Sequence, residues 1–165
     1  MNLKTMLLAF VVVFILLANM LEPPEPQETV SNTTVNNYSN IFFNYDIIRY
    51  PSCVEVTSGQ TNSTITLGFA TESWNINFGA VPANGSYSTR TVDLSNSNEH
   101  DVEIILKAYG NISNHVSFSK NNILLNPEEK TSVSIIFTSN EIADFYSGEI
   151  DVIIKKPIYN FPVIV

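Results

Sequence analysis

The chain has 165 residues and a formal net charge of −8; 44% of its residues are apolar and only 15% are charged. This length suits one folded domain after a non-globular front end is set aside. The acidic balance provides no basic surface, which argues strongly against nucleic acid as a partner. The single cysteine, Cys53, excludes an internal disulfide and a cysteine-based zinc site, and we expect it to be a buried apolar thiol.

Residues 1–21 read as a membrane or export signal. An uncharged apolar run extends from Met6 to Leu21. It is slightly shorter than the roughly 20 residues that span a bilayer comfortably, and slightly longer than many signal-peptide cores. Residues 18–20 match a cleavage site poorly, which favours a retained signal anchor over a cleaved signal peptide. Because Lys4 precedes the run and Glu22 follows it, the positive-inside rule predicts a single pass through the cell membrane, with the N-terminus cytoplasmic and the C-terminal domain outside.

Residues 22–40 are expected to be a stalk. Glu and Pro dominate the part from Glu22 to Glu28, a composition that is extended and stiff. The remainder is almost all Ser, Thr and Asn, which is too polar to bury a core. The sequence therefore predicts a spacer that lifts a domain over 41–165 off the membrane. Five Asn-x-Ser/Thr sequons are possible N-glycosylation sites, two in the stalk and three at predicted turns: Asn32, Asn37, Asn62, Asn84 and Asn111.

The domain begins with segments that favour strands. Residues 41–51 are rich in aromatic and β-branched side chains and predict a first strand. Residues 53–70 alternate apolar and polar side chains on both sides of a Ser-Gly-Gln turn, which predicts a hairpin. In the next strand Trp74 shares one face with Ile76 and Phe78. We therefore expect Trp74 to be a core anchor rather than a sugar-stacking side chain.

Alternation also marks the second half of the domain. Residues 102–108 place apolar side chains on one face, and Ile105, the exception, is expected to lie against a neighbouring element. Residues 148–155 have the same pattern, so we expect Glu149 and Asp151 on the wet side of their strand.

The C-terminal residues 157–165 are strongly apolar, but Pro162 excludes them from the middle of a sheet, so an edge strand is expected. Short strands separated by turns at this spacing are typical of a two-sheet sandwich. The chain is thus predicted to be all-β, with a single immunoglobulin-like β-sandwich of about 7–9 strands preceded by one N-terminal transmembrane or signal-anchor helix.

No constellation in the sequence carries recognisable chemistry. His100 and His115 fall in or near different loops, and neither has a partner at metal-ligand spacing. Residues 96–101, Asn-Ser-Asn-Glu-His-Asp, place oxygen ligands at alternate positions, which suits Ca²⁺. The same residue types dominate ordinary turns, and a turn is favoured. No catalytic residue, cofactor or metal ligand is therefore predicted.

The stretch from Ile76 to Phe137 resembles the immunoglobulin-like domains of the abnormal-spindle/Hydin type. The likeness is carried by Asn-Phe-Gly-Ala-Val at 77–81, Gly85, Leu-Ser-Asn at 94–96, Asp-Val at 101–102, Asn-Pro-Glu at 126–128 and Val-Ser-Ile-Ile-Phe at 133–137. Such domains usually place Gly after the late proline, where this chain has Glu128. The resemblance implies a binding or scaffolding module without catalysis. The apolar front end makes archaeal and bacterial surface proteins the better comparison.

These features predict a non-enzymatic, membrane-anchored surface protein whose external sandwich binds another cell-envelope component, such as a surface-layer protein. One alternative is a structural or filament subunit that assembles with copies of itself by adding its C-terminal strand to a neighbour's sheet edge. Another is a glycan- or polymer-binding module that uses exposed aromatic side chains, with Tyr87, Tyr109 and Tyr159 as candidates.

Overall fold

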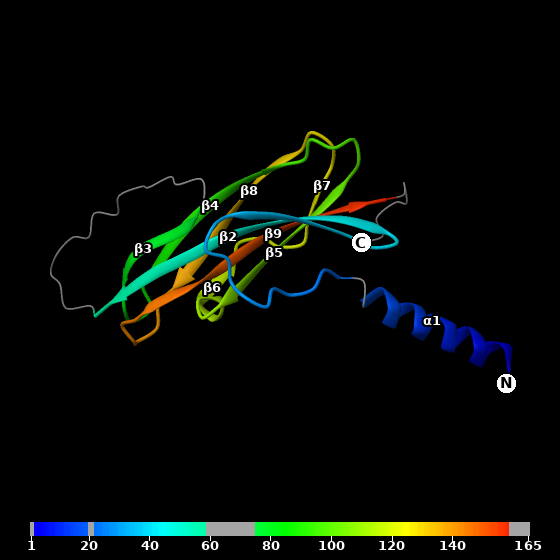
Figure 1. Cartoon of the computed structure of the whole chain (residues 1–165), viewed down its shortest axis with the longest axis horizontal. Coiled ribbons are helices and arrows are strands. Elements are labelled where there is room, and N and C mark those ends of the chain that lie inside the picture. Colours follow the sequence, from blue (N-terminus) through cyan, green and yellow to red (C-terminus); the bar gives the residue numbers. More distant parts are fainter. Residues whose placement is uncertain (1, 20–21, 59–74, 159–165) are drawn as a thin grey trace.

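The computed structural model describes residues 2–19, 22–58 and 75–158 of the chain. These residues form one α-helix, α1 (Leu3–Asn19), nine β-strands and a short 3₁₀ turn, η1 (Ser113–His115). The strands make two sheets that pack face to face (Figure 1). The prediction of an all-β sandwich is confirmed. The second strand of the hairpin expected over 53–70, Trp74 and the C-terminal edge strand with Pro162 lie outside the described residues.

Sheet A contains six of the strands and holds the centre of the molecule. Its order is β1-β2-β9-β5-β7, with β3 also beside β2, and every pair is antiparallel except the parallel pair of β2 with β3. The bounds are β1 (Thr34–Ser39), β2 (Phe43–Thr57), β3 (Ile76–Pro82), β5 (Val102–Gly110), β7 (Ile123–Leu125) and β9 (Phe145–Pro157).

β2 is a single long strand where the sequence predicted two segments. It pairs with β9 over residues 43–55, and on its other edge with β1 over residues 44–49 and then with β3 over residues 52–57. Pro51 lies in the interval between β1 and β3. A proline lacks the N–H that a sheet ladder requires, so this gap is where the strand tolerates one. Cys53, also in β2, is half-buried rather than buried.

Sheet B is smaller and covers one face of sheet A. It consists of β4 (Tyr87–Ser95), β8 (Lys130–Thr138) and β6 (Val116–Phe118), in the antiparallel order β4-β8-β6. Residues 83–86 carry the chain from sheet A to sheet B, and Gly85 takes a positive φ of 81° at this corner. A left-handed conformation is readily adopted by glycine, which explains the sharp turn there.

The alternating apolar residues meet between the two sheets. Ile76, Phe78, Ile104, Ile135 and Phe137 are all buried there, and the rings of Phe78 and Phe137 lie 5.8 Å apart. Ile76 and Phe78 therefore share the core face, as expected.

Ile105 faces the other way, as its position out of the alternation requires. It packs on the outer face of sheet A against a small cluster formed by Tyr45, Ile47 and Ile153. The expectation that Ile105 lies against a neighbouring element is confirmed.

Part of the segment expected to be a stalk belongs to the domain. Thr34–Ser39 are strand β1, paired over their whole length with β2. Residues 22–33, here called the strap, lead from α1 to β1 along sheet A (Figure 1). The Ser, Thr and Asn side chains of β1 bury little apolar surface, but a strand at a sheet edge is held by its backbone hydrogen bonds, and these do not depend on apolar side chains. The sandwich thus begins before residue 41.

Helix α1 has 17 residues. Its described side chains are exposed and mostly apolar, among them Phe10, Val13 and Phe14. In the described part of the chain, no helix reaches the length and apolar content that crossing a membrane requires.

Candidate functional site

The outer face of sheet A, turned away from sheet B, carries a cluster of polar and charged side chains. β2 contributes Arg49, β9 contributes Glu149 and Asp151, and β5 contributes Lys107 and Tyr109. Asp151 lies directly between Arg49 and Lys107 in the strand register, and Glu149 lies beside Tyr109. Residues directly opposite one another in antiparallel strands project to the same face, so this register brings the five side chains together.

The expectation that Glu149 and Asp151 face water is wrong. Their exposed fractions are 0% and 2%. Alternation does place them away from the core between the sheets, but β9 runs between β2 and β5, and the strap lies over it. The backbone N–H of Val30 in the strap donates a hydrogen bond of 2.7 Å to Oε2 of Glu149. A second contact joins Glu22 to Lys107, with 3.8 Å between Oε2 and Nζ.

Burial raises the pKa of two side chains in this cluster. Burial, followed by the charge of the neighbouring Glu149, raises the pKa of Asp151 to about 7, while Arg49 and Lys107 oppose the rise. The Arg49 Nε lies 3.6 Å from Oδ2 of Asp151. Burial, followed by the charge of Asp151, also raises the pKa of Tyr109 to about 12. Asp151 therefore exchanges a proton near neutral pH in a buried cluster whose neighbouring Glu149 is hydrogen-bonded to the strap.

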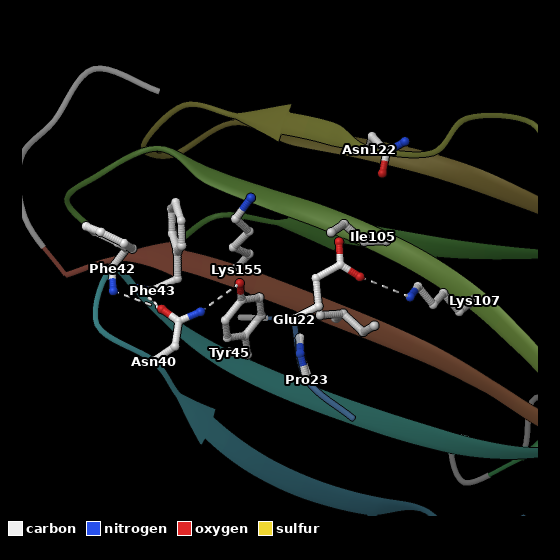
Figure 2. Close-up of a pocket in the computed structure, with 11 residues that line it drawn as sticks. Glu22, Pro23, Asn40, Phe42, Phe43, Tyr45, Ile105, Lys107, Asn122 and Lys155 are labelled. Carbon is white, nitrogen blue, oxygen red and sulfur yellow. Dashed lines mark hydrogen bonds and ion pairs between the residues drawn. The ribbon is translucent and has the colours of Figure 1, made fainter. Parts of the chain in front are cut away.

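A pocket of about 320 Å³ lies on the same face beside this cluster, and Lys107 belongs to both (Figure 2). It is lined by the strap, by the turn between β1 and β2, and by side chains of β2, β5 and β9. Asn40 organises its wall, because its Oδ1 accepts hydrogen bonds of 2.8 Å from the N–H groups of Phe42 and Phe43. The ammonium group of Lys155 lies 4.4 Å from the centre of the Phe43 ring. The pocket thus combines aromatic rings, amides, the ammonium groups of two lysines and the carboxylate of Glu22, which is paired with Lys107.

The turn between β1 and β2, residues 40–43, is here called the β1–β2 tip. Ile41 is 69% exposed. The ring of Phe42 meets the ring of Phe14 of α1 edge to face, with 6.3 Å between the centroids. The strap runs away from the end of α1, and β1 brings the chain back to the same side of the sandwich (Figure 1). The N-terminal segment therefore doubles back, and one end of the domain lies beside the helix.

The outer face of sheet B differs in character. Its β4 side chains are Thr89, Thr91, Asp93 and Ser95, and Ser132 and Ser134 come from β8. At one end of this face Tyr87 is 72% exposed. Among the described residues no segment lies over these side chains as the strap lies over sheet A. This face presents hydroxyl groups, the carboxylate of Asp93, the ammonium group of Lys130 and the ring of Tyr87 to solvent.

The possible glycosylation sites fall in different surroundings. Asn32, Asn37 and Asn84 have exposed side chains, but Asn37 is in strand β1 rather than in a spacer. Asn111 is also exposed, yet its Oδ1 accepts a hydrogen bond of 2.6 Å from the N–H of Ser147. Asn62 lies outside the described residues.

The aromatic candidates do not gather into one platform. Tyr87 is exposed on sheet B, and Tyr109 is half-buried in the cluster on sheet A. Tyr159 lies outside the described residues.

The polar stretch 96–101 is a turn built around Asn96. The Asn96 side chain is buried, and its Nδ2 donates to the carbonyl oxygens of His100 and Leu125, both at 2.9 Å. Its Oδ1 accepts a hydrogen bond of 2.9 Å from the N–H of Asn98. The Asn96 side chain is therefore engaged within the turn itself. Over residues 2–19, 22–58 and 75–158, no group of three or more His, Cys, Asp or Glu side chains is placed to hold a metal.

The sequence contains one partial signal for the polar cluster on sheet A and one for the wall of the pocket. Alternation indicates that Glu149 and Asp151 point away from the core, but it does not show what covers them. Asn40, shortly before Phe42 and Phe43, is a turn signal, since Asn bonds its own backbone, yet residues 41–51 read as one strand.

No family model, curated protein or solved structure matches this chain.

Proposed function

We propose that the chain is a non-enzymatic surface protein, anchored in the cell membrane by α1, whose external sandwich binds another protein of the cell envelope. The observation that carries this proposal is the difference between the two outer faces. The strap, which leads to α1, occupies the face of sheet A, and the hydroxyl-rich face of sheet B is exposed. Because the strap covers one outer face of the sandwich, the other outer face is the one available to a partner. Ser and Tyr side chains suit such a face, because they combine adaptable hydrogen bonding with rigid aromatic area.

The composition of α1 supports the anchor. A helix of 17 residues rises about 25 Å, compared with a hydrocarbon core of about 30 Å. Local thinning of the bilayer and extension of flanking side chains accommodate a difference of this size at modest cost. Exposed apolar side chains such as Phe10 and Val13 are unfavourable in water and favourable in lipid. Lys4 in the first turn of the helix and Glu22 after its end favour an external domain.

Photo-crosslinking in intact cells tests the proposal. A photoreactive phenylalanine in place of Tyr87 samples the face of sheet B, and the same residue in place of Ile158 samples the C-terminal end, where 40% of the side chain is exposed. Mass spectrometry then identifies the adducts. We expect adducts at position 87 to contain a different envelope protein.

Two other outcomes would contradict this proposal. Adducts that join two copies of the chain, mainly through position 158, would favour the self-assembling subunit. Adducts at position 87 that contain only polysaccharide would favour the glycan-binding module. Ile142 lies in a loop, is 63% exposed and provides a control for chance collisions.

A further inference from the structure

We propose that the β1–β2 tip inserts into the membrane interface beside α1, so that the phospholipid surface is a second binding partner of the sandwich. This inference rests on the proposed function, because it takes α1 to lie in the membrane. It replaces the idea of a spacer that holds the domain away from the membrane with direct contact between the two.

The first support is the apolar surface of the tip and its continuity with α1. Ile41 projects from the turn with 69% of its surface exposed, and the Phe42 ring touches the Phe14 ring. Phe10 and Val13 are exposed on the same helix. An apolar surface that continues from a lipid-embedded helix onto the adjoining turn is suited to the same lipid. This continuity selects phospholipid over a protein partner.

The second support is the hydrogen bonding of the tip's backbone. Asn40 N–H donates to the Phe43 carbonyl oxygen at 2.9 Å, and Asn40 Oδ1 accepts from the N–H groups of Phe42 and Phe43. The Phe42 carbonyl oxygen accepts from Ile158 N–H at 2.9 Å. Unpaired backbone groups are costly outside water, so a turn that satisfies these groups internally enters the interface at lower cost.

The third support is the depth that the contact implies. Phe14 precedes the last helical residue, Asn19, by five positions in the sequence. At about 1.5 Å per residue, the Phe14–Phe42 contact lies roughly 7 Å inside the end of α1. Interfacial segments bury their apolar faces by about 5–10 Å. The tip would therefore reach the boundary between headgroups and acyl chains without crossing it.

Charged side chains begin behind the tip and are paired there. Lys156 forms an ion pair with Asp46, and Lys155 forms one with Glu103 at 2.8 Å. In the ladder of β2 with β9, Lys156 lies opposite Asn44 and Lys155 opposite Tyr45, so both cations lie just inward of residues 40–43. Lysines with apolar stems at this level suit the headgroup region. The paired charges mark the boundary between the part that enters lipid and the part that stays in water.

The test uses the full chain with Cys53→Ser, one new cysteine per variant, and a polarity-sensitive fluorophore on that cysteine. The variants are Ile41→Cys at the tip, Val13→Cys in α1 and Ile142→Cys as the matched control, because Ile142 is exposed nearly as fully as Ile41 but lies in the loop before β9. Each labelled protein is reconstituted into vesicles of phosphatidylethanolamine and phosphatidylglycerol. Emission wavelength, quenching by aqueous iodide and quenching by nitroxide-labelled phospholipid are then measured.

We expect the label at position 41 to emit at shorter wavelength than the label at position 142. It should also be quenched several-fold less by iodide and strongly by the nitroxide lipid. Iodide quenching at position 41 equal to that at position 142 would overturn the inference. Protection from iodide without nitroxide quenching would also overturn it, since a second copy or another protein would then cover the tip.

The label at position 13 separates this inference from the proposed function. If position 13 is in lipid and position 41 is in water, the anchor stands and tip insertion is wrong. If position 41 is in lipid and position 13 is in water, the tip binds lipid and the anchor is wrong. If both are in water, both proposals fall.

Discussion

The backbone N–H of Val30 donates a hydrogen bond of 2.7 Å to Oε2 of Glu149, and so joins the strap to the central strand of sheet A. Two positions along the same strand and face, Asp151 is buried beside Arg49. A segment of low apolar content is thus fixed to the domain by polar contacts, and the protonation of the buried carboxyl group enters the stability of the fold.

Stability should rise as the pH falls from about 8 to about 5. Burial raises the pKa of Asp151 to about 7 in the folded chain, compared with about 3.9 when unfolded. Between these values the folded state holds a proton that the unfolded state has lost, so this group opposes folding at high pH and ceases to do so in acid. Each unit between the two pKa values corresponds to about 1.4 kcal/mol. Urea unfolding at a series of pH values measures the change.

Asp151→Asn should remove this pH dependence, and at pH 8 it should raise the free energy of unfolding by at least about 1 kcal/mol. Asp144→Asn is the matched control, because Asp144 is exposed. An Asp151→Asn variant that keeps the wild-type slope would show that Asp151 is not the source of the pH dependence.

Gly148→Ala should be strongly destabilising. A Cβ at this position would lie 2.0 Å from the carbonyl oxygen of Tyr109 and 2.8 Å from Cγ2 of Ile112. The first contact is with the backbone of β5, which cannot move without disturbing the sheet. We expect a loss of more than about 3 kcal/mol, in the range of severe core changes. Thermal or urea unfolding provides the measurement.

Gly85→Ala is the comparison for Gly148→Ala. Gly85 has a positive φ of 81°, but a Cβ added there would meet no atom within 4 Å. Only backbone strain should act, at about 1–2 kcal/mol. Equal losses for the two variants would show that β5 and β9 do not approach as closely as the structure has them.

The sequence predicted those parts of the fold in which the apolar side chain of a residue determines where that residue lies. Ile76, Phe78 and Ile104 were assigned to a core-facing row because alternation and burial coincide there. Strand β1 was missed because a polar edge strand is held by its backbone, which leaves no apolar pattern in the sequence. The burial of Glu149 was missed for a related reason, since its cover comes from a segment 119 residues away in the chain. Long-range contacts of this kind leave no local signal.

Asn96→Ala should cost about 1–3 kcal/mol, the penalty for leaving a buried polar partner without its hydrogen bond. The Asn96 amide bridges the carbonyl oxygens of His100 and Leu125, and the Leu125 bond is buried. Asn98→Ala is the control, because Asn98 is only half-buried and bonds back to Asn96. Urea unfolding should rank Asn96→Ala well above Asn98→Ala in cost. Addition of Ca²⁺ should leave the urea midpoint of the wild-type protein unchanged. A midpoint that rises with Ca²⁺ would support a cation site at residues 96–101.

Glu128→Gly should stabilise the protein. Glu128 has a positive φ of 63° at the turn before β8, a conformation that favours glycine. The left-handed conformation costs a non-glycine residue about 1–2 kcal/mol. The glycine variant loses about 0.4–1 kcal/mol of this gain in stability, because glycine increases the conformational entropy of the unfolded chain. The hydrogen bond of 2.9 Å from Glu128 N–H to the Asn96 carbonyl oxygen is kept, so a net gain of roughly 0.5–1 kcal/mol remains.

The neighbouring change, Glu129→Gly, should destabilise instead, because Oε2 of Glu129 accepts hydrogen bonds of 2.9 Å and 2.7 Å from the N–H and Nδ2 of Asn126. If urea melts show that both glycines destabilise alike, residue 128 does not occupy the left-handed region in solution.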